Sequence, residues 1–342
     1  MVCSIFAVHT ILSPPNIEVI KMERQQIPIG SNFGKNSTAE DVLAGINLKN
    51  IHVVVTGGHA GLGLETSKAL AHAGALVTVA SRNVEEAYTA TKDIPNIKIE
   101  ALDLSNLNDS KSSVWEFSQR LLKQDRHIDL LINNAGIMAC AETRVGNNWE
   151  SQFAVNHLGH FALTNQLWPL LKGGARVVTL SSAGHQLSPI RWNDIHFRYD
   201  YDHWLAYGQA KTANALFSVH LDTLGQKDNV RSFSVHPGNI ATSLQRHLTH
   251  EEMFAMGWID KDGNPTIADL KTPQQGVATT IWAATTPELN TLGGLYCEDC
   301  DIAKLKSSTE ITFKEVEAYA VDTEQAKRLW DLSSELTSSN AF

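Results

Sequence analysis

Tyr207 and Lys211 are four residues apart in the segment Tyr-Gly-Gln-Ala-Lys. In a helix, side chains four residues apart lie on the same face, one turn from each other. A nearby ammonium group favours the phenolate, so we expect the pKa of Tyr207 to lie below its ordinary value of about 10. Such a pair can exchange a proton with a bound molecule. A solvated helix face produces the same pattern, so the rest of the chain must decide.

A glycine-rich turn lies upstream of this pair, in the segment Thr56–Gly63. It follows an apolar run and precedes a helix with apolar periodicity. Glycines let the backbone approach a pyrophosphate closely, and a helix N-terminus offers unpaired N–H groups to its charge. The spacing is Gly-x-x-x-Gly-x-Gly rather than the commoner Gly-x-Gly-x-x-Gly. A simple turn is the alternative, but the strand–turn–helix context favours a dinucleotide site.

The residues that follow the second apolar run bear on which dinucleotide would bind. NAD-selective sites usually carry an acid there, which binds the ribose hydroxyl pair. This chain has Ser81, Arg82 and Asn83 instead. A guanidinium can hold a 2′-phosphate through two hydrogen bonds, so NADP(H) is favoured over NAD(H). Glu85 and Glu86 are close by in the sequence, so NAD(H) remains the alternative cofactor. In that case Arg82 would be a surface charge.

Apolar runs alternate with helical patterns around these motifs. The expected strands are His52–Thr56, Ala75–Ala80, Ile97–Leu102, Ile128–Asn133, Arg176–Ser181 and Val230–His236. The expected helices between and after them are Leu62–Ala73, Val84–Lys92, Leu107–Lys123, Trp149–Leu171, Leu205–Leu224, Pro273–Ala284 and Thr323–Leu336. Continuous apolar strands indicate burial on both faces, and the intervening helices indicate right-handed crossovers. The sequence predicts an α/β fold, a single Rossmann-type doubly wound parallel sheet with helices on both faces.

One domain is expected over residues 41–342, after a loosely ordered N-terminal extension over residues 1–40. The segment from Ile240 to Leu270 breaks the alternation directly after the sixth strand. Open α/β sheets bind ligands at this carboxyl edge. We therefore predict a substrate-covering flap at about residues 240–270, with a plain surface excursion as the alternative.

Composition excludes several classes of partner. The chain has 342 residues, of which 43% are hydrophobic and 19% charged, as in ordinary globular proteins. A net charge of -9 without a basic stripe argues against binding to nucleic acid or an anionic membrane. No apolar run is long enough to span a membrane, and the N-terminal stretch does not have the pattern of a signal peptide. We therefore expect a cytoplasmic protein. Cys297 and Cys300 have no second ligand pair nearby, which predicts reduced thiols and no metal site.

Taken together, the motifs resemble the short-chain dehydrogenase/reductase family. They occur in that family's order and at compatible spacings, over about Leu48 to Ile302. They are Thr56–Gly63, Asn133–Gly136, Asn156, Ser181-Ser182, Tyr207 with Lys211, and Pro237-Gly238. More narrowly, Val155–Phe161, Ser181–His185 and Lys211–Phe217 are similar to the branch that contains retinol dehydrogenases and WW-domain oxidoreductases.

The resemblance implies a catalytic role for four residues. Tyr207 would be the general acid or base, and Lys211 would lower its pKa and hold the nicotinamide ribose. Ser182 would donate a hydrogen bond to the substrate oxygen, a role for which Ser181 competes. Asn156 would hold a structural water that relays protons from Lys211. The alternatives are a buried tyrosine, an exposed lysine and a helix-bending asparagine.

The resemblance also implies a set of residues that contact the cofactor. Tyr207 and Lys211 belong to this set. In the glycine-rich turn they are Gly57, His59, Gly61, Leu62 and Gly63, although His59 departs from the polar or basic residue often found there. Further contacts would come from Arg82, from the adenine-binding pair Asp103-Leu104, from Asn133, Ala135 and Gly136, and from Pro237, Gly238 and Thr242. Strand-ending turns and a helix-capping Asp103 are the alternatives.

The implied function is an NADP(H)-dependent oxidoreductase that interconverts a carbonyl and an alcohol. Aromatic residues before Tyr207 and in the flap suggest a fairly apolar small-molecule substrate; the former are Trp192, Phe197, Tyr199, Tyr201 and Trp204. The resemblance is compatible with a homo-oligomer. A catalytically silent nucleotide-sensing or interaction protein, or an epimerase or dehydratase relative, are the alternatives. His157 and His160 are expected to be core or surface histidines, and His185 to line the mouth of the active site.

Overall fold

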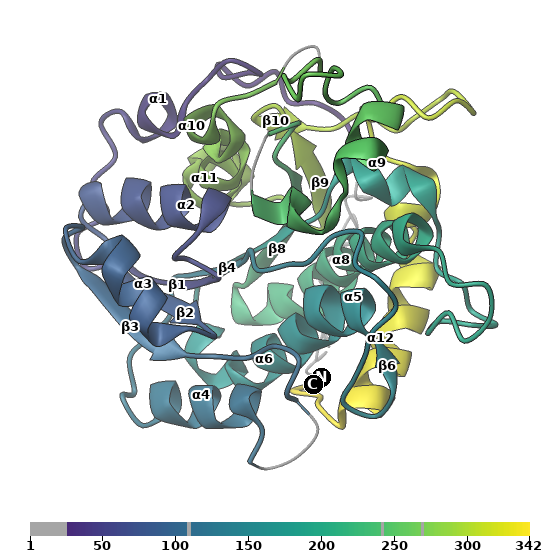
Figure 1. Ribbon diagram of the computed structural model, residues 1–342. Helices are drawn as coiled ribbons and strands as arrows, with labels where there is room; N and C mark the ends of the chain where they lie inside the picture. Colours follow the sequence, from purple (N-terminus) through teal and green to yellow (C-terminus); the bar gives the residue numbers. More distant parts are fainter. Residues whose placement is uncertain (1–25, 108–110, 241–242, 268–269) are drawn as a thin grey trace, which may run out of the picture.

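An eight-stranded sheet forms the centre of the computed structural model, which describes residues 26–107, 111–240, 243–267 and 270–342 (Figure 1). The strand order is β10-β9-β8-β7-β4-β1-β2-β3. The six predicted strands are present and parallel: β1 (His52–Thr56), β2 (Leu76–Ser81), β3 (Ile97–Ala101), β4 (Leu130–Asn133), β7 (Arg176–Leu180) and β8 (Arg231–His236). The predicted Rossmann-type sheet is therefore confirmed, and its crossovers bring the carboxyl ends of these strands to one edge.

The sequence did not predict the last two strands. β9 (Leu295–Glu298) extends the sheet in parallel, and β10 (Asp301–Ile302) pairs with it antiparallel. The sheet is thus mixed at this edge. Cys297 and Cys300 lie in this hairpin as buried free thiols, and burial raises the pKa of both.

Side chains of the central strands alternate between two apolar cores. Val53 and Val55 face α1 (Ala39–Leu43), α2 (Gly61–His72), α3 (Val84–Thr91) and α11 (Ala278–Thr285). Val54 faces the core formed with α4 (Ser113–Leu122), α6 (Gly159–Gln166), α8 (His203–Gly225) and α12 (Thr323–Thr337). The two sets of helices cover opposite faces of the sheet (Figure 1), as a doubly wound fold requires.

The predicted helix Trp149–Leu171 is divided into several pieces. Trp149 and Glu150 form β6, which pairs with β5 (Arg144–Val145). α5 (Ser151–Phe153) then passes into a π-helical turn, Ala154–Leu158, before α6, and α7 (Trp168–Leu171) begins with a proline in its first turn. The Glu150 carboxylate caps α5 by accepting from the N–H groups of Gln152 and Phe153. Such π turns are frequent at functional sites, and this one contains Asn156.

The described part of the expected N-terminal extension is tied to the sheet edge. The buried Gln26 amide donates to the carbonyls of Tyr296 and Ala303 at 2.6 and 2.8 Å. The Asp301 carboxylate accepts from the N–H groups of Ile29 and Gly30. These contacts tie Gln26, Ile29 and Gly30 to the edge of the sheet, and the loose ordering expected for residues 1–40 stays a prediction. Residues 1–25 lie outside the described residues.

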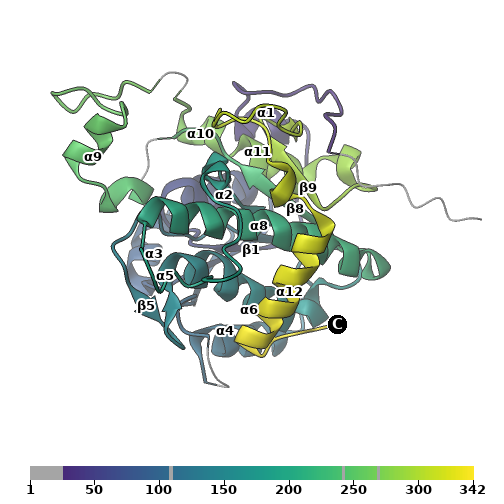
Figure 2. The ribbon, with the colours of Figure 1, turned by 90° about the vertical axis from the view of Figure 1, so that its right-hand side faces the viewer.

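The segment predicted to be a flap follows β8, and its residues 241–242 and 268–269 lie outside the described residues. It contains a 3₁₀ turn (η4, Ser243–His247), α9 (His250–Ala255) and a bridge between Ile259 and Pro265, and it returns to α10 (Pro273–Gly276). Thr249 and Glu252 form a reciprocal capping box that starts α9. Figure 2 shows α9 standing out from the sheet and its helices. Within the described residues, no helix is both long and apolar enough to cross a membrane.

Candidate active site

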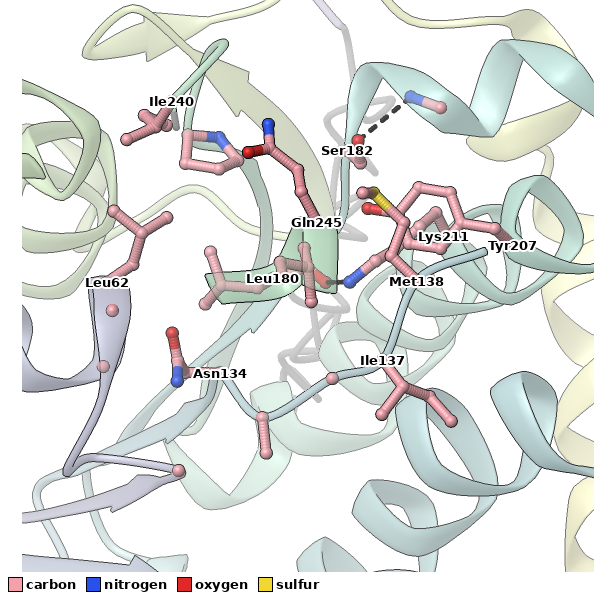
Figure 3. Close-up of a pocket in the computed structure, with 18 of the residues that line it drawn as sticks. Leu62, Asn134, Ile137, Met138, Leu180, Ser182, Tyr207, Lys211, Ile240 and Gln245 are labelled. Carbon is pink, nitrogen blue, oxygen red and sulfur yellow. Dashed lines mark hydrogen bonds between the residues drawn. The ribbon is translucent and has the colours of Figure 1, made fainter. Parts of the chain in front are cut away.

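A cavity of about 1130 Å³ opens at the carboxyl edge of the sheet (Figure 3). Most of the residues predicted to bind a cofactor or to act on a substrate line it. They are Gly57, His59, Gly61, Leu62, Gly63, Arg82, Asp103, Leu104, Ala135, Gly136, Ser182, Tyr207, Lys211, Pro237 and Gly238. Asn133 and Asn156 do not line it, and Thr242 lies outside the described residues.

The glycine-rich turn forms one wall of this cavity. Gly57 and Gly61 have φ angles of +62° and +51°, which favour glycine. A Cβ atom at Gly63 would lie 2.2 Å from the Gly57 carbonyl oxygen, so no larger residue fits there without backbone movement. α2 begins at Gly61 with no side-chain cap on its N-terminus. Its first N–H groups are thus available to an anionic ligand.

Thr56 and His160 hold the loop after β4 against this wall. The His160 Nδ1 atom lies 2.9 Å from the Asn156 carbonyl oxygen, which can only accept, so Nδ1 carries the proton. Nε2 is then the acceptor for the Thr56 hydroxyl at 2.8 Å. The Thr56 oxygen in turn accepts from the N–H groups of Asn134 and Ala135 at 2.9 and 3.0 Å. The π turn and the cavity wall are therefore joined by one chain of hydrogen bonds.

The two asparagines outside the cavity bond to other groups of the protein. Asn133 is buried and donates to the hydroxyls of Thr164 and Thr179, so its neighbour Asn134 reaches the cavity instead. The sequence pattern could have shown this difference between Asn133 and Asn134, because successive side chains of a strand point to opposite faces of the sheet. The Asn156 amide exchanges two hydrogen bonds, each 2.9 Å long, with the backbone of Ile137. The Asn156 side chain thus holds the backbone of Ile137, which lines the cavity, and its predicted catalytic role stays a prediction.

Asp103 and Leu104 line the adenine-side part of the predicted cofactor site. The Asp103 carboxylate accepts from the N–H and the hydroxyl of Ser105 at 2.9 and 2.7 Å. It does not cap the next helix, because α4 begins later than predicted and Ser112 is its N-cap. The position of Asp103 therefore supports its interpretation as a cavity residue rather than as a helix cap.

The two adjacent serines have different environments. The Ser181 hydroxyl is buried and donates to the Lys211 carbonyl at 2.8 Å, which fixes α8 to the end of β7. The Ser182 hydroxyl lines the cavity and accepts from the Gly184 N–H at 3.0 Å (Figure 3). Ser182 also hydrogen-bonds the Tyr207 phenol. Both serines line the cavity, but the Ser181 hydroxyl donates to the backbone, so Ser182 is the serine whose hydroxyl is better placed to bond a bound molecule.

Tyr207 and Lys211 lie side by side on α8, with the Lys211 Nζ 5.6 Å from the centroid of the Tyr207 ring (Figure 3). Lys211 Nζ donates to the Leu180 carbonyl at 2.9 Å. Burial raises the pKa of Tyr207 to about 12, against the opposing effect of the Ser182 hydrogen bond. Burial also lowers the pKa of Lys211 to about 8. The expected depression of the Tyr207 pKa is thus wrong for this state, because loss of water outweighs the neighbouring ammonium.

The histidines that drew attention in the sequence are structural. His157 is buried and pairs with the Ser333 hydroxyl at 2.7 Å, and His160 is the buried link described above. Both are core histidines, which is one of the two alternatives predicted for them. His185 is also fully buried and does not line the cavity, so its predicted place at the mouth is wrong. Burial lowers the pKa of His185 to about 4.

The other end of the cavity is largely apolar, and it comes partly from the predicted flap and partly from Met138, Leu187 and Phe313, which the sequence analysis did not single out. Met138, Leu187, Leu244, Met256, Trp258 and Phe313 line it. Among the aromatic residues that precede Tyr207, Trp204 lines the cavity and meets Trp258 edge-on at 5.8 Å. Trp192, Phe197, Tyr199 and Tyr201 do not line it. The apolar wall thus depends on the flap and on the region before α12.

Comparisons with known proteins agree with this geometry. A family model described as short chain dehydrogenase matches residues 51–253. A probable oxidoreductase of Streptomyces lividans is 39% identical over 86% of this chain and 99% of its own length. Human retinol dehydrogenase 11 is 37% identical over 83% of this chain and 85% of its own.

The fold has counterparts among solved structures as well. A structure described as a putative uncharacterized protein from Mycobacterium paratuberculosis has a TM-score of 0.68 and 30% identity, and it covers 90% of this chain and 99% of its own. The family match spans more than half of the chain, and the relatives align over most of their length. The chain therefore belongs to the short-chain dehydrogenase/reductase family and is an oxidoreductase.

Proposed function

We propose that this oxidoreductase interconverts a carbonyl and an alcohol, with NADP(H) as cofactor and Tyr207 as the general acid or base. One observation carries the proposal. Ser182, Tyr207 and Lys211 line the same cavity as the glycine-rich turn at the N-terminus of α2. A proton donor and a hydrogen-bond donor thus share one space with a cradle for a pyrophosphate.

The residues of the cavity fit a nicotinamide dinucleotide. The Gly57, Gly61 and Gly63 turn would hold the pyrophosphate, since its wall has no room for a Cβ at Gly63. Asp103, Leu104 and Ala135 would contact the adenosine half, and Lys211 with the Pro237-Gly238 loop the nicotinamide half. When bound, the cofactor supplies the hydride for carbonyl reduction, or accepts it in the reverse direction.

The protein's own groups would handle the proton. At pH 7 the Tyr207 phenol is neutral, since burial raises its pKa to about 12, so it can donate a proton to a substrate oxygen. The Ser182 oxygen accepts from the Gly184 N–H, and its hydroxyl would turn to donate to the same substrate oxygen. The Lys211 ammonium lies beside the phenol ring and would favour the phenolate once the proton has left.

The wild-type protein provides the first test. NADPH oxidation measured at 340 nm against a panel of aldehydes and ketones should show turnover, strongest for apolar compounds. Cofactor binding without turnover on any member of the panel would favour the nucleotide-sensing alternative. Cofactor that stays bound through purification would favour the epimerase or dehydratase alternative.

Arg82 should set the preference for the phosphorylated cofactor. Its exposed side chain lines the cavity and, among the described residues, forms no ion pair. Charge-assisted hydrogen bonds contribute about 1.5–3 kcal/mol, so Arg82→Glu should raise the Kd for NADPH roughly 10- to 100-fold. The Kd for NADH should change little, because NADH has no 2′-phosphate. Fluorescence titration measures both constants.

A surface arginine away from the cavity supplies the control for this substitution. Arg126 is exposed and does not line the cavity, so Arg126→Glu makes the same charge change elsewhere. It should leave both constants as in the wild type. Equal NADPH affinity in the Arg82 and Arg126 variants would contradict the proposed cofactor preference.

The pH dependence should follow Lys211. Burial lowers its pKa to about 8, so the ammonium is present below pH 8 and is lost as the pH rises through that value. Because kcat/KM reports groups of the free enzyme, kcat/KM for NADPH should fall by about tenfold per pH unit well above 8. Initial rates between pH 6 and 10 at saturating carbonyl measure this. A profile that stays flat up to pH 9.5 would remove Lys211 from cofactor binding.

A further inference from the structure

A short segment between β10 and α12 reaches back to the active site. We call residues 312–315 the strap. They belong to the yellow loop that lies at the same end of the molecule as α9 in Figures 1 and 2. The strap packs against the turn Ala183–Leu187, which directly follows Ser182.

One side chain of that turn binds the whole strap. Gln186 is 7% exposed, and its amide oxygen accepts from the N–H groups of Thr312 and Phe313, each at 3.1 Å. Its amide nitrogen donates to the carbonyls of Lys314 and Glu315 at 2.6 and 3.3 Å. A carboxamide has two acceptor sites and two donor protons, so Gln186 uses its full capacity on four consecutive residues.

Two further contacts fix the end of the strap. The Glu298 carboxylate accepts from the Glu315 N–H at 3.0 and 3.1 Å. The His185 Nε2 atom accepts from the Glu317 N–H at 3.1 Å, just beyond the strap. Phe313 and Glu315 have φ angles of +54° and +67°, a conformation that side chains rarely adopt. Residues held in this way keep the conformation because their surroundings impose it.

The strap places Phe313 in the wall of the cavity. Phe313 lines it together with Leu187 from the same turn and Trp258 from the flap. The Phe313 side chain is 47% exposed, so a bound molecule can still cover part of the ring. Because Gln186 belongs to the turn that begins at Ser182, the position of the ring is tied to that of the serine.

We infer that Phe313 is a specificity-determining residue that contacts the apolar tail of a carbonyl substrate, and that Gln186 is the positioning residue that places it. This inference rests on the proposed function, since it assigns a contact to the substrate of the same site. The substrate class is then a carbonyl compound whose apolar chain reaches from Ser182 to the strap.

A series of straight-chain aldehydes from propanal to decanal tests this assignment. In Phe313→Ala, KM for decanal should rise about tenfold, while kcat and KM for propanal stay unchanged, because propanal lacks the long apolar tail that the ring is proposed to contact. Ile311→Ala is the matched control. Ile311 is 51% exposed in the same loop but does not line the cavity, so this variant should behave as the wild type with every aldehyde.

Gln186→Leu separates positioning from a general loss of structure. It should raise KM for decanal as Phe313→Ala does and leave propanal turnover intact. The double variant should be no worse than Phe313→Ala alone, because Gln186 acts through the ring. Equal losses for propanal and decanal in Gln186→Leu, or additive losses in the double variant, would contradict the positioning role.

A binding measurement separates this inference from the proposed function. Trp204 and Trp258 line the cavity, so decanol binding can be followed through quenching of tryptophan fluorescence without turnover. Weaker decanol binding in Phe313→Ala but not in Ile311→Ala supports the inference, even if no aldehyde is reduced and the proposed function fails. Equal decanol Kd values in the wild type and Phe313→Ala overturn the inference, even if aldehydes are reduced.

Discussion

Tyr207→Phe should lower the rate of NADPH-dependent carbonyl reduction by about 10²- to 10⁴-fold, the range for loss of a general acid. The substitution removes only the hydroxyl, which hydrogen-bonds Ser182 and faces the cavity. The ring remains edge-on to Trp204 at 6.3 Å and close to Gly184, where a Cβ would lie 2.7 Å from it. The site should therefore keep its shape. Single-turnover kinetics with bound NADPH isolate the chemical step from product release.

Two controls accompany this variant. The Kd for NADPH should stay within a few fold of the wild-type value, because the glycine-rich turn and Arg82 are untouched. Tyr88→Phe makes the same change at a tyrosine that is 64% exposed and does not line this cavity, and it should reduce carbonyls at the wild-type rate. Wild-type turnover by Tyr207→Phe would show that another group delivers the proton.

Gly63→Ala should cause a large loss of cofactor affinity. The new Cβ would lie 2.2 Å from the Gly57 carbonyl oxygen and 2.5 Å from the Asn134 amide nitrogen. The first contact is with backbone, so the turn must open. Overpacking costs about 1–3 kcal/mol in well-packed regions. We expect a loss of that size in the free energy of unfolding and a Kd for NADPH raised more than about tenfold.

Gly34→Ala is the matched control for this substitution. Gly34 has no atom within 4 Å of an added Cβ and no positive φ, so its replacement should change neither quantity. Urea denaturation and NADPH titration measure the two quantities. If Gly63→Ala binds NADPH as tightly as Gly34→Ala does, the turn after β1 is not the pyrophosphate cradle.

The sequence by itself determined the parts of this protein that depend on local pattern. Apolar runs such as Val53–Val55 are too continuous for a half-exposed strand, so they predict a strand buried on both faces. The glycines at positions 57, 61 and 63 stand between a strand and a helix, a context that predicts a turn open to phosphate. Spacing by four placed Tyr207 and Lys211 on one helix face.

Contacts between distant segments were decided only by the tertiary structure. The anchoring of Gln26 on Tyr296 joins residues 270 positions apart, which no local window contains. Asn156 lies in a π turn because its carbonyl and amide bind His160 and Ile137, and only the fold brings Ile137 to it. Phe313 reaches the cavity through Gln186, which is 127 positions away.

The electrostatic state of the site also had to come from the tertiary structure. The spacing of Tyr207 and Lys211 predicted a lowered phenol pKa, but burial raises it to about 12. A sequence shows which charges are neighbours along a helix. It does not show how much water the fold removes from them, and desolvation is the larger effect here. Local pattern therefore placed Tyr207 and Lys211 on one helix face, and the packing of the whole chain shifted their pKa values.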